Sequence, residues 1–175
     1  MKTVEQIRTE YIDKPTIQRI GLLHPSLRTE AMLIYNQIRQ RLTGKTTVRF
    51  THTLRTFAEQ DALYAQGRTK PGQRVTNAKG GQSFHNYGLA IDICLLVDKD
   101  NNGTFEAAVW DTLLDADADG IKDWAECVAV FEEYGWEWGG RWRTFTDLPH
   151  FQKVSGKSVA QLLAAKKDSA GYVMV

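Results

Sequence analysis

Residues 83–97 read SFHNYGLAIDICLLV, and the second half of this stretch decides the fold. From Leu89 to Val97 the chain is apolar, interrupted only by Asp92. A short apolar run of this kind predicts a buried strand. An ionised carboxylate is costly to bury unless it is paired or coordinates a metal. Asp92 therefore either helps to bind a metal ion or bonds a nearby arginine or backbone amides.

The residues around this strand mix helical and strand periodicity. Thr56 and Glu59 form a capping-box pattern, which indicates the start of a helix. Helices are predicted at residues 27–42, 57–66, 123–134 and 158–167, and strands at 46–54, 89–97, 136–142 and 149–154. Because these elements follow no regular βαβ rhythm, the sequence predicts an α+β fold.

Composition excludes several classes of protein. The chain has 175 residues, 42% of them hydrophobic, and a net charge of +1, which gives no field that would draw it to nucleic acid. No stretch approaches the roughly 20 apolar residues of a membrane span. The N-terminus lacks the apolar core of a signal peptide, so we expect synthesis in the cytoplasm. Cys94 and Cys127 lie in apolar surroundings, which are typical of buried reduced thiols.

Two of the four histidines are candidate metal ligands. His85 lies in a loop just before Asp92, and His150 follows Pro149 far downstream. A catalytic zinc ion takes three protein ligands drawn from His, Asp, Glu and Cys, and keeps one position for water. From spacing alone, His150 fits a hydrogen-bonded core histidine equally well. We expect His24 to be structural and His52 to be a core or strand-edge residue.

Two separated motifs resemble a known family. Ser-x-His-x-x-Gly-x-Ala-x-Asp at residues 83–92, followed by Asp-x-Pro-His-Phe at residues 147–151, is similar to the metallopeptidases that include D-alanyl-D-alanine carboxypeptidases, vancomycin-resistance dipeptidases and phage L-alanyl-D-glutamate endolysins. The resemblance runs from about Leu22 to Gln152. It implies that residues 1–175 form a single peptidase domain. The expected fold is of the Hedgehog and D,D-peptidase type, with a small central antiparallel sheet and flanking helices.

The resemblance also implies roles for individual residues. His85, Asp92 and His150 are expected to bind zinc, and Asp147 to act as the general base, although many relatives carry glutamate there. Arg55 is expected to steady an oxyanion or a substrate carboxylate. Gln60 and Ser83 match positions that line the substrate site. A solvated helix face is the alternative for Gln60, and a local turn bond is the alternative for Ser83.

An acidic insertion is expected at residues 98–126. Residues 115–126 fit the twelve-position EF-hand loop, so calcium is the second cofactor to consider. Its candidate ligands are Asp115, Asp117, Asp119, the carbonyl of Ile121, Asp123 and Glu126. The loop's eighth position is Lys122 rather than an aliphatic residue, which favours an isolated site over one half of a pair. Residues 98–103 begin in the same way but have Val109 at the last position, so we interpret them as an acidic turn or a weak site.

The sequence therefore predicts a zinc peptidase that cuts peptidoglycan stem peptides, most simply as an L-alanyl-D-glutamate endopeptidase. The alternatives are a D,D-carboxypeptidase or D-Ala-D-Ala dipeptidase on the same scaffold, and a metal-bound binding module without activity. A monomer is expected. If the protein is a phage endolysin, a holin would release it to the cell wall. A basic loop at residues 68–82 is interpreted as either a solvated loop or a rim that attracts the carboxylates of the stem peptide.

Overall fold

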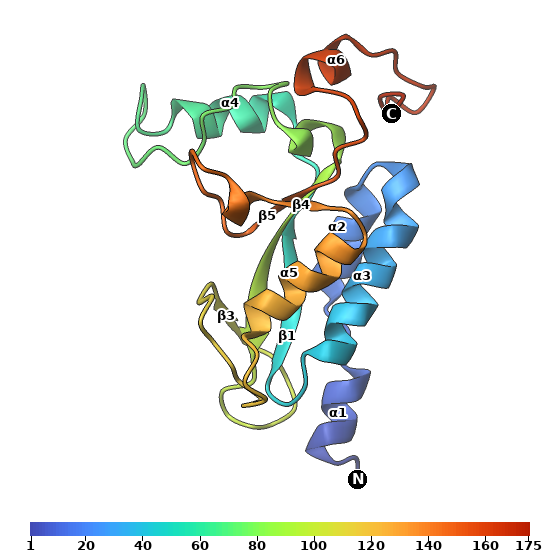
Figure 1. Ribbon diagram of the computed structural model, residues 1–175, viewed down its shortest axis with the longest axis vertical. Coiled ribbons are helices and arrows are strands. Elements are labelled where there is room, and N and C mark those ends of the chain that lie inside the picture. The colour runs from blue at the N-terminus through green and yellow to red at the C-terminus, as the bar shows by residue number, and fades with distance from the viewer.

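The computed structural model describes residues 1–175, and strand β2 (Ala90–Val97) lies at the centre of its sheet (Figure 1). Strand β2 pairs with β1 (Thr46–His52), with β3 (Ala107–Val109) and with β5 (His150–Gln152), and β5 pairs in turn with β4 (Glu137–Trp138). All of these pairings are antiparallel. The predicted buried strand and the predicted antiparallel sheet are therefore confirmed.

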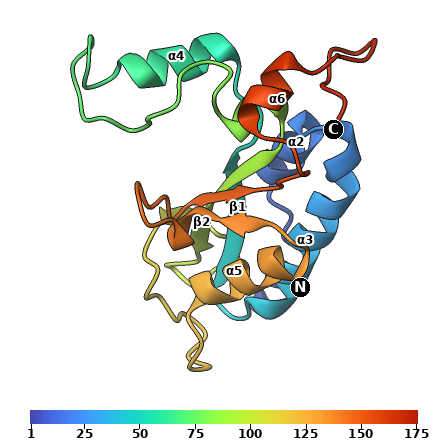
Figure 2. The same ribbon diagram turned by 45° about the horizontal axis from the view of Figure 1, so that its top comes forward.

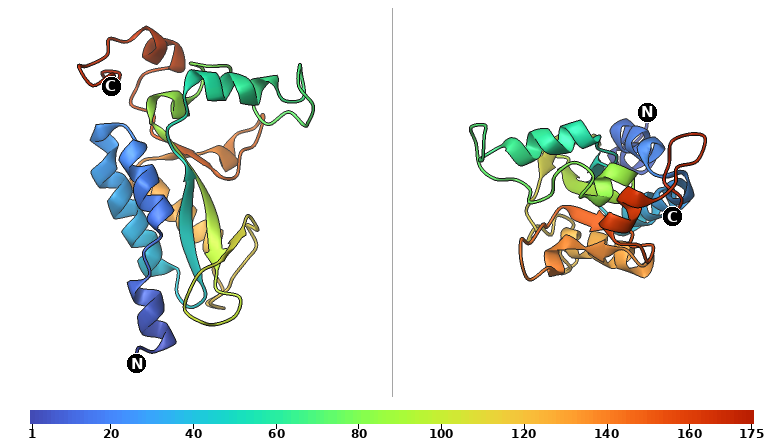
Figure 3. Two further views of the ribbon diagram at one scale, coloured as in Figure 1. Left: turned by 180° about the vertical axis from the view of Figure 1, so that it is seen from behind. Right: turned by 90° about the horizontal axis from the view of Figure 1, so that it is seen from above.

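The main core lies between this sheet and three helices. Helices α2 (Lys14–Leu22) and α3 (Arg28–Arg41) run alongside β1, and α5 (Asp123–Glu133) packs against α3 (Figures 1 and 3). Phe50 of β1 lies between the rings of Tyr35 and Phe131, with centroid distances of 5.9 Å to each. The predicted α+β class agrees with this arrangement, because helices cover an antiparallel sheet.

Shorter elements lie at the end of the molecule away from α1 (Figures 1 and 2). Helix α4 (Phe57–Ala65), the 3-10 helix η2 (Phe84–Tyr87) and α6 (Val159–Ala164) lie together there, as Figure 2 shows. The 3-10 helix η1 (Pro25–Leu27) leads into α3, and η3 (Gly139–Arg141) comes directly after β4. No helix in the structure is both long and apolar enough to span a bilayer.

The sequence patterns missed two helices and overextended one strand. Helix α1 (Val4–Glu10) has no buried residue, and α2 buries only Thr16 and Ile20, so few buried apolar positions mark either helix in the sequence. The strand predicted at residues 136–142 is reduced to Glu137–Trp138, because the chain turns into η3 at Gly139. Strand β3 also went unpredicted, within the acidic insertion.

Candidate metal centre

The pairing of β2 with β5 places two of the expected ligands side by side. Asp92 lies directly opposite His150 in the antiparallel register. His52 lies opposite Asp92 on the other edge of β2, after an irregularity in the pairing with β1. The imidazole of His150 and the carboxylate of Asp92 therefore meet although 58 residues separate them in the chain.

The third expected ligand, His85, is presented by η2. Ser83 caps this short helix by accepting a hydrogen bond from the amide of His85. The helix ends at Gly88, whose φ of 67° is left-handed, and a Cβ there would lie 2.6 Å from the backbone nitrogen of His24. Only glycine fits both conditions. The backbone of His85 is also bonded to Arg55, whose amide donates to its carbonyl at 3.0 Å.

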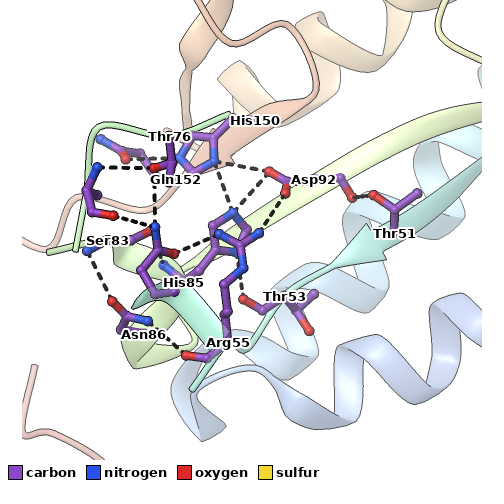
Figure 4. A network of polar contacts seen from close by, with 12 residues as sticks. Thr51, Thr53, Arg55, Thr76, Ser83, His85, Asn86, Asp92, His150 and Gln152 are labelled. Carbon is purple, nitrogen blue, oxygen red and sulfur yellow. Dashed lines mark hydrogen bonds and ion pairs between the residues drawn. The ribbon is translucent and has the colours of Figure 1, made fainter. Parts of the chain in front are cut away.

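The three candidate ligand atoms form a small triangle (Figure 4). His85 Nε2 lies 3.0 Å from Asp92 Oδ1 and 3.1 Å from His150 Nδ1, and His150 Nδ1 lies 3.1 Å from Asp92 Oδ1. The tetrahedral zinc distances of about 2.0–2.1 Å separate neighbouring ligand atoms by roughly 3.3 Å. The observed triangle is close to this size.

Outer hydrogen bonds show which ring nitrogens carry hydrogen. His85 Nδ1 lies 2.7 Å from the carbonyl of Thr53, which can only accept, so Nδ1 donates and Nε2 is bare. Gln152 Nε2 donates to Glu137, which turns the amide oxygen of Gln152 toward His150 Nε2 at 3.1 Å. His150 Nε2 therefore donates as well, and Nδ1 is bare.

This arrangement fits a bound cation. Three lone-pair atoms face one another with neither ring hydrogen between them, which is favourable only if a positive charge lies among them. Two imidazoles and one carboxylate are a donor set that zinc accepts, with a fourth position left for water. The ligands are well covered, because His85 and His150 are buried and the Asp92 side chain is 17% exposed.

Mutual electrostatics favour the ionised carboxylate of Asp92. Burial would raise the pKa of the Asp92 carboxyl, but the charges and hydrogen bonds of His85 and His150 lower it below its ordinary value. Burial would likewise lower the pKa of His150, but Asp92 raises it. The carboxylate of Asp92 is thus the negative charge around which the site is organised.

Asp147, the expected general base, shares a turn with His150. The amide of Asp147 donates to the carbonyl of Gly139 at 3.1 Å, and the amide of His150 donates to the carbonyl of Asp147 at 3.3 Å. A Cβ at Gly139 would lie 2.5 Å from the Asp147 carbonyl oxygen and 3.3 Å from His150 Cβ, so the turn needs glycine at this position. Burial, and then the charge of Asp92, raise the pKa of the Asp147 carboxyl.

Arg55 lies beside Asp92, but Gln60 is placed differently from our expectation. Arg55 Nη2 is 3.6 Å from Asp92 Oδ2, and Arg55 Nη1 donates to Gln60 Oε1 at 2.8 Å. Gln60 is fully buried, and its amide nitrogen donates to Thr76 and to the carbonyl of Ala78. The prediction that Gln60 contacts substrate is corrected, as is the solvated alternative, because its polar atoms are all used to hold Arg55 and the 76–78 segment.

The three ligands, Arg55 and Asp147 all face one cavity of about 610 Å³. This volume suits a peptide-sized ligand. Ser83 also faces the cavity, so its local turn bond and an exposed position for substrate contact coexist. Further lining comes from the 75–78 segment and from three aromatic residues, Trp110, Trp142 and Phe145. In the basic loop, Arg68 stacks on Tyr64 at 3.9 Å and bonds the carbonyls of Tyr64 and Thr76, so Arg68 supports the segment that lines the cavity.

The other two histidines, His24 and His52, and the acidic residues at 115–126 lie outside the ligand triangle. His24 is buried between Ser26 and the carbonyl of Val173, which agrees with a structural role. His52 is exposed at the end of edge strand β1 and faces the cavity, so it is not a core residue. The acidic residues at 115–126 gather in two overlapping groups at the start of α5, away from this cavity.

Sequence reasoning missed the residues that orient the ligands. Thr53 acts through its backbone carbonyl, which no side-chain pattern reveals. Gln152 comes two positions after His150 in a strand, so both side chains point to the same face. That spacing was a usable signal.

Comparisons with known proteins agree with this geometry. Residues 76–153 match the family model described as D-alanyl-D-alanine carboxypeptidase. The chain is 46% identical over 104 residues to the peptidoglycan L-alanyl-D-glutamate endopeptidase CwlK of Bacillus subtilis (strain 168). That match covers 59% of this chain and 59% of the length of CwlK.

The fold also has a solved counterpart. The crystal structure of the L-Ala D-Glu endopeptidase ChiX from Serratia marcescens superposes with a TM-score of 0.54 at 19% identity. The superposition covers 87% of this chain and 96% of ChiX. This likeness concerns the fold alone, and it agrees with the α+β architecture of a small antiparallel sheet and flanking helices expected from the sequence.

Proposed function

We propose that this chain, which matches the D-alanyl-D-alanine carboxypeptidase family through residues 76–153, is a zinc-dependent L-alanyl-D-glutamate endopeptidase of peptidoglycan stem peptides. The observation that carries the proposal is the triangle of bare ligand atoms from His85, Asp92 and His150, open to a cavity that also holds Asp147 and Arg55. The choice of bond rests on the 46% identity with CwlK.

His85, Asp92 and His150 would hold the zinc ion. Bound zinc supplies a water of lowered pKa, near 7 in many enzymes, and polarises a carbonyl. His85 and His150 keep their bare nitrogens turned toward the ion because Thr53 and Gln152 hold the opposite ring hydrogens.

Asp147 would move the proton. Its carboxylate faces the cavity next to the ligands, and its raised pKa makes it a stronger base than an exposed aspartate. It can accept the proton that the attacking water loses and later deliver that proton to the leaving amine. Arg55 presents guanidinium hydrogens to the same space, where they can stabilise an oxyanion or pair with a substrate carboxylate.

The family model itself favours one alternative, a D,D-carboxypeptidase, which would release a terminal D-alanine. The endopeptidase and the carboxypeptidase would use the same zinc chemistry and differ in which peptide bond of the substrate is placed at the zinc ion. The place of action proposed for either is the cell wall. The calcium expected at residues 115–126 takes no part in this reaction, since those residues do not line the cavity.

Purified peptidoglycan digested with the zinc-loaded protein tests the proposal by mass analysis of the released fragments. We expect new C-terminal L-alanine and new N-terminal D-glutamate, and loss of both when zinc is removed. Release of D-alanine alone would replace the endopeptidase by the carboxypeptidase. No release of either kind at any zinc concentration would favour the inactive binding module.

The variant Asp147→Asn tests the chemical role of the carboxylate. It keeps the shape of the side chain, so zinc content should be unchanged while turnover falls by about 10²–10⁴-fold. The matched control Asp100→Asn removes an exposed carboxylate outside the cavity and should leave turnover unchanged. Wild-type turnover in Asp147→Asn would exclude Asp147 as the base.

A further inference from the structure

The loop that precedes α5 gathers carboxylates at the end of the molecule opposite α4 (Figures 1 and 2). One oxygen from each of Asp115, Asp117 and Asp123 lies within 4.8 Å of the other two. The same holds for Asp117, Asp119 and Glu126, so Asp117 joins the two groups. None of these residues lines the zinc cavity, so a ligand bound among them would be independent of the proposed peptidase function.

Two oxygens in this cluster are buried without any hydrogen-bond partner. Glu126 is only 8% exposed, and its Oε2 has no partner. Asp115 Oδ1 is in the same condition. A buried carboxylate oxygen that nothing neutralises is strongly unfavourable. Burial, and then the charges of Asp119, Asp117 and Asp123, raise the pKa of Glu126 to about 7.

The first acidic turn shows how this chain satisfies a buried carboxylate when no metal is needed. Asp98 is completely buried, but Arg8 Nη2 donates to its Oδ2 at 2.8 Å. The amides of Asn102 and Gly103 donate to the same carboxylate. No arginine plays this part for Glu126. Lys122 Nζ is 3.7 Å from Asp115 Oδ2, yet it is a half-exposed side chain at the rim of the cluster.

We infer that residues 115–126 form a calcium site, with the unpartnered oxygens of Glu126 and Asp115 directed at the ion. All the side chains that converge there offer hard oxygen ligands and neither nitrogen nor sulfur, which favours calcium over zinc. Their spacing is that of an EF-hand loop, in which Glu126 takes the last, bidentate position and Ile121 contributes its carbonyl.

The structure also indicates what the ion would do. Thr43, in the turn between α3 and β1, donates to Asp117 Oδ2 through its amide at 3.2 Å and its hydroxyl at 2.5 Å. Glu126 lies on α5, whose next residue, Cys127, belongs to the main core. An ion shared by Asp117 and Glu126 would therefore tie the start of α5 to the α3–β1 turn and stabilise the fold.

Thermal unfolding of the zinc-loaded protein, freed of calcium and then titrated with CaCl2, tests this site. The wild type should gain about 5–10 °C in Tm at a calcium concentration about 100 times the dissociation constant. In Glu126→Gln the buried charge is gone, so the calcium-free Tm should be equal to or above that of the wild type, while the calcium-dependent gain is lost. Asp100→Asn, in the other acidic turn, should gain as much as the wild type.

Terbium luminescence gives a second readout on the folded protein. Trp124 lies within the proposed loop, so it should sensitise the luminescence of bound Tb³⁺. Added calcium should displace Tb³⁺ and lower this luminescence. Asp119→Asn, at an exposed position, should weaken this signal without lowering the calcium-free Tm, because it removes a charge that acts unfavourably on Glu126. Absence of any calcium-dependent shift in the wild type, or an equal shift in Glu126→Gln, would overturn the site. An equal gain with MgCl2 would overturn its assignment to calcium.

Discussion

Gln152 is expected to position a zinc ligand, and the substitution Gln152→Met tests this. The amide of Gln152 accepts from His150 Nε2 at 3.1 Å and donates to Glu137 at 3.0 Å. Methionine has a similar length and volume but cannot hold the ring hydrogen of His150. The imidazole would then be free to rotate or to move its hydrogen to Nδ1, which is the atom that faces Asp92 and His85.

These contacts set the size of the effect. Loss of an outer hydrogen bond to a metal-bound histidine typically lowers metal affinity by about 10–100-fold, or about 1.4–2.7 kcal/mol. His150 is 6% exposed, so its Nε2 hydrogen would also remain buried without a partner, which costs about 1–3 kcal/mol of folding stability. Both losses should appear in one variant.

Competition with a chromophoric zinc chelator measures the affinity, and thermal unfolding of the zinc-free protein measures the stability. Gln37→Met is a matched control, because Gln37 also donates to a glutamate, Glu133, and accepts from Tyr134, but on the surface of α3. It should leave zinc affinity unchanged. If Gln152→Met binds zinc as tightly as the wild type, Gln152 does not position His150.

Two further substitutions probe the walls of the site. Gly139→Ala should push the Asp147 turn against His150 and cost about 1–3 kcal/mol in unfolding experiments, together with most of the turnover. Gly21→Ala, in α2 with nothing within 4 Å of the added Cβ, should be neutral or stabilising, and a similar loss in both variants would contradict the close-contact argument. Arg55→Lys keeps the charge but loses the planar fork, so turnover should fall by about 10–100-fold at constant zinc content. Unchanged turnover in Arg55→Lys would mean that the reaction does not need the paired N–H donors of the guanidinium.

Local patterns in the sequence predicted the central strand well and singled out Asp92, whereas the full ligand set came from the family resemblance and stays a prediction. Asp92 is conspicuous because a carboxylate interrupts an apolar run, and the capping box at Thr56 and Glu59 is present as expected. The register that pairs Asp92 with His150 depends on contacts between distant segments, so the pattern of either strand alone could not give it.

The misplacement of Gln60 has a similar cause. Helix α4 has a weak apolar face, and nothing in its own sequence shows that the 76–78 segment folds over Gln60. The burial of Glu126 was equally invisible, because the EF-hand spacing specifies candidate ligands but not whether other donors reach them. Tertiary contacts, rather than local propensity, decided both cases.

The X-ray absorption spectrum at the zinc edge tests the central claim most directly. We predict one zinc ion per chain, surrounded only by nitrogen and oxygen at about 2.0–2.1 Å with the signature of two imidazoles, and loss of that spectrum in Asp92→Asn. A sulfur neighbour at about 2.3 Å, or the same spectrum in Asp92→Asn, would contradict the assignment of His85, Asp92 and His150 as the ligands.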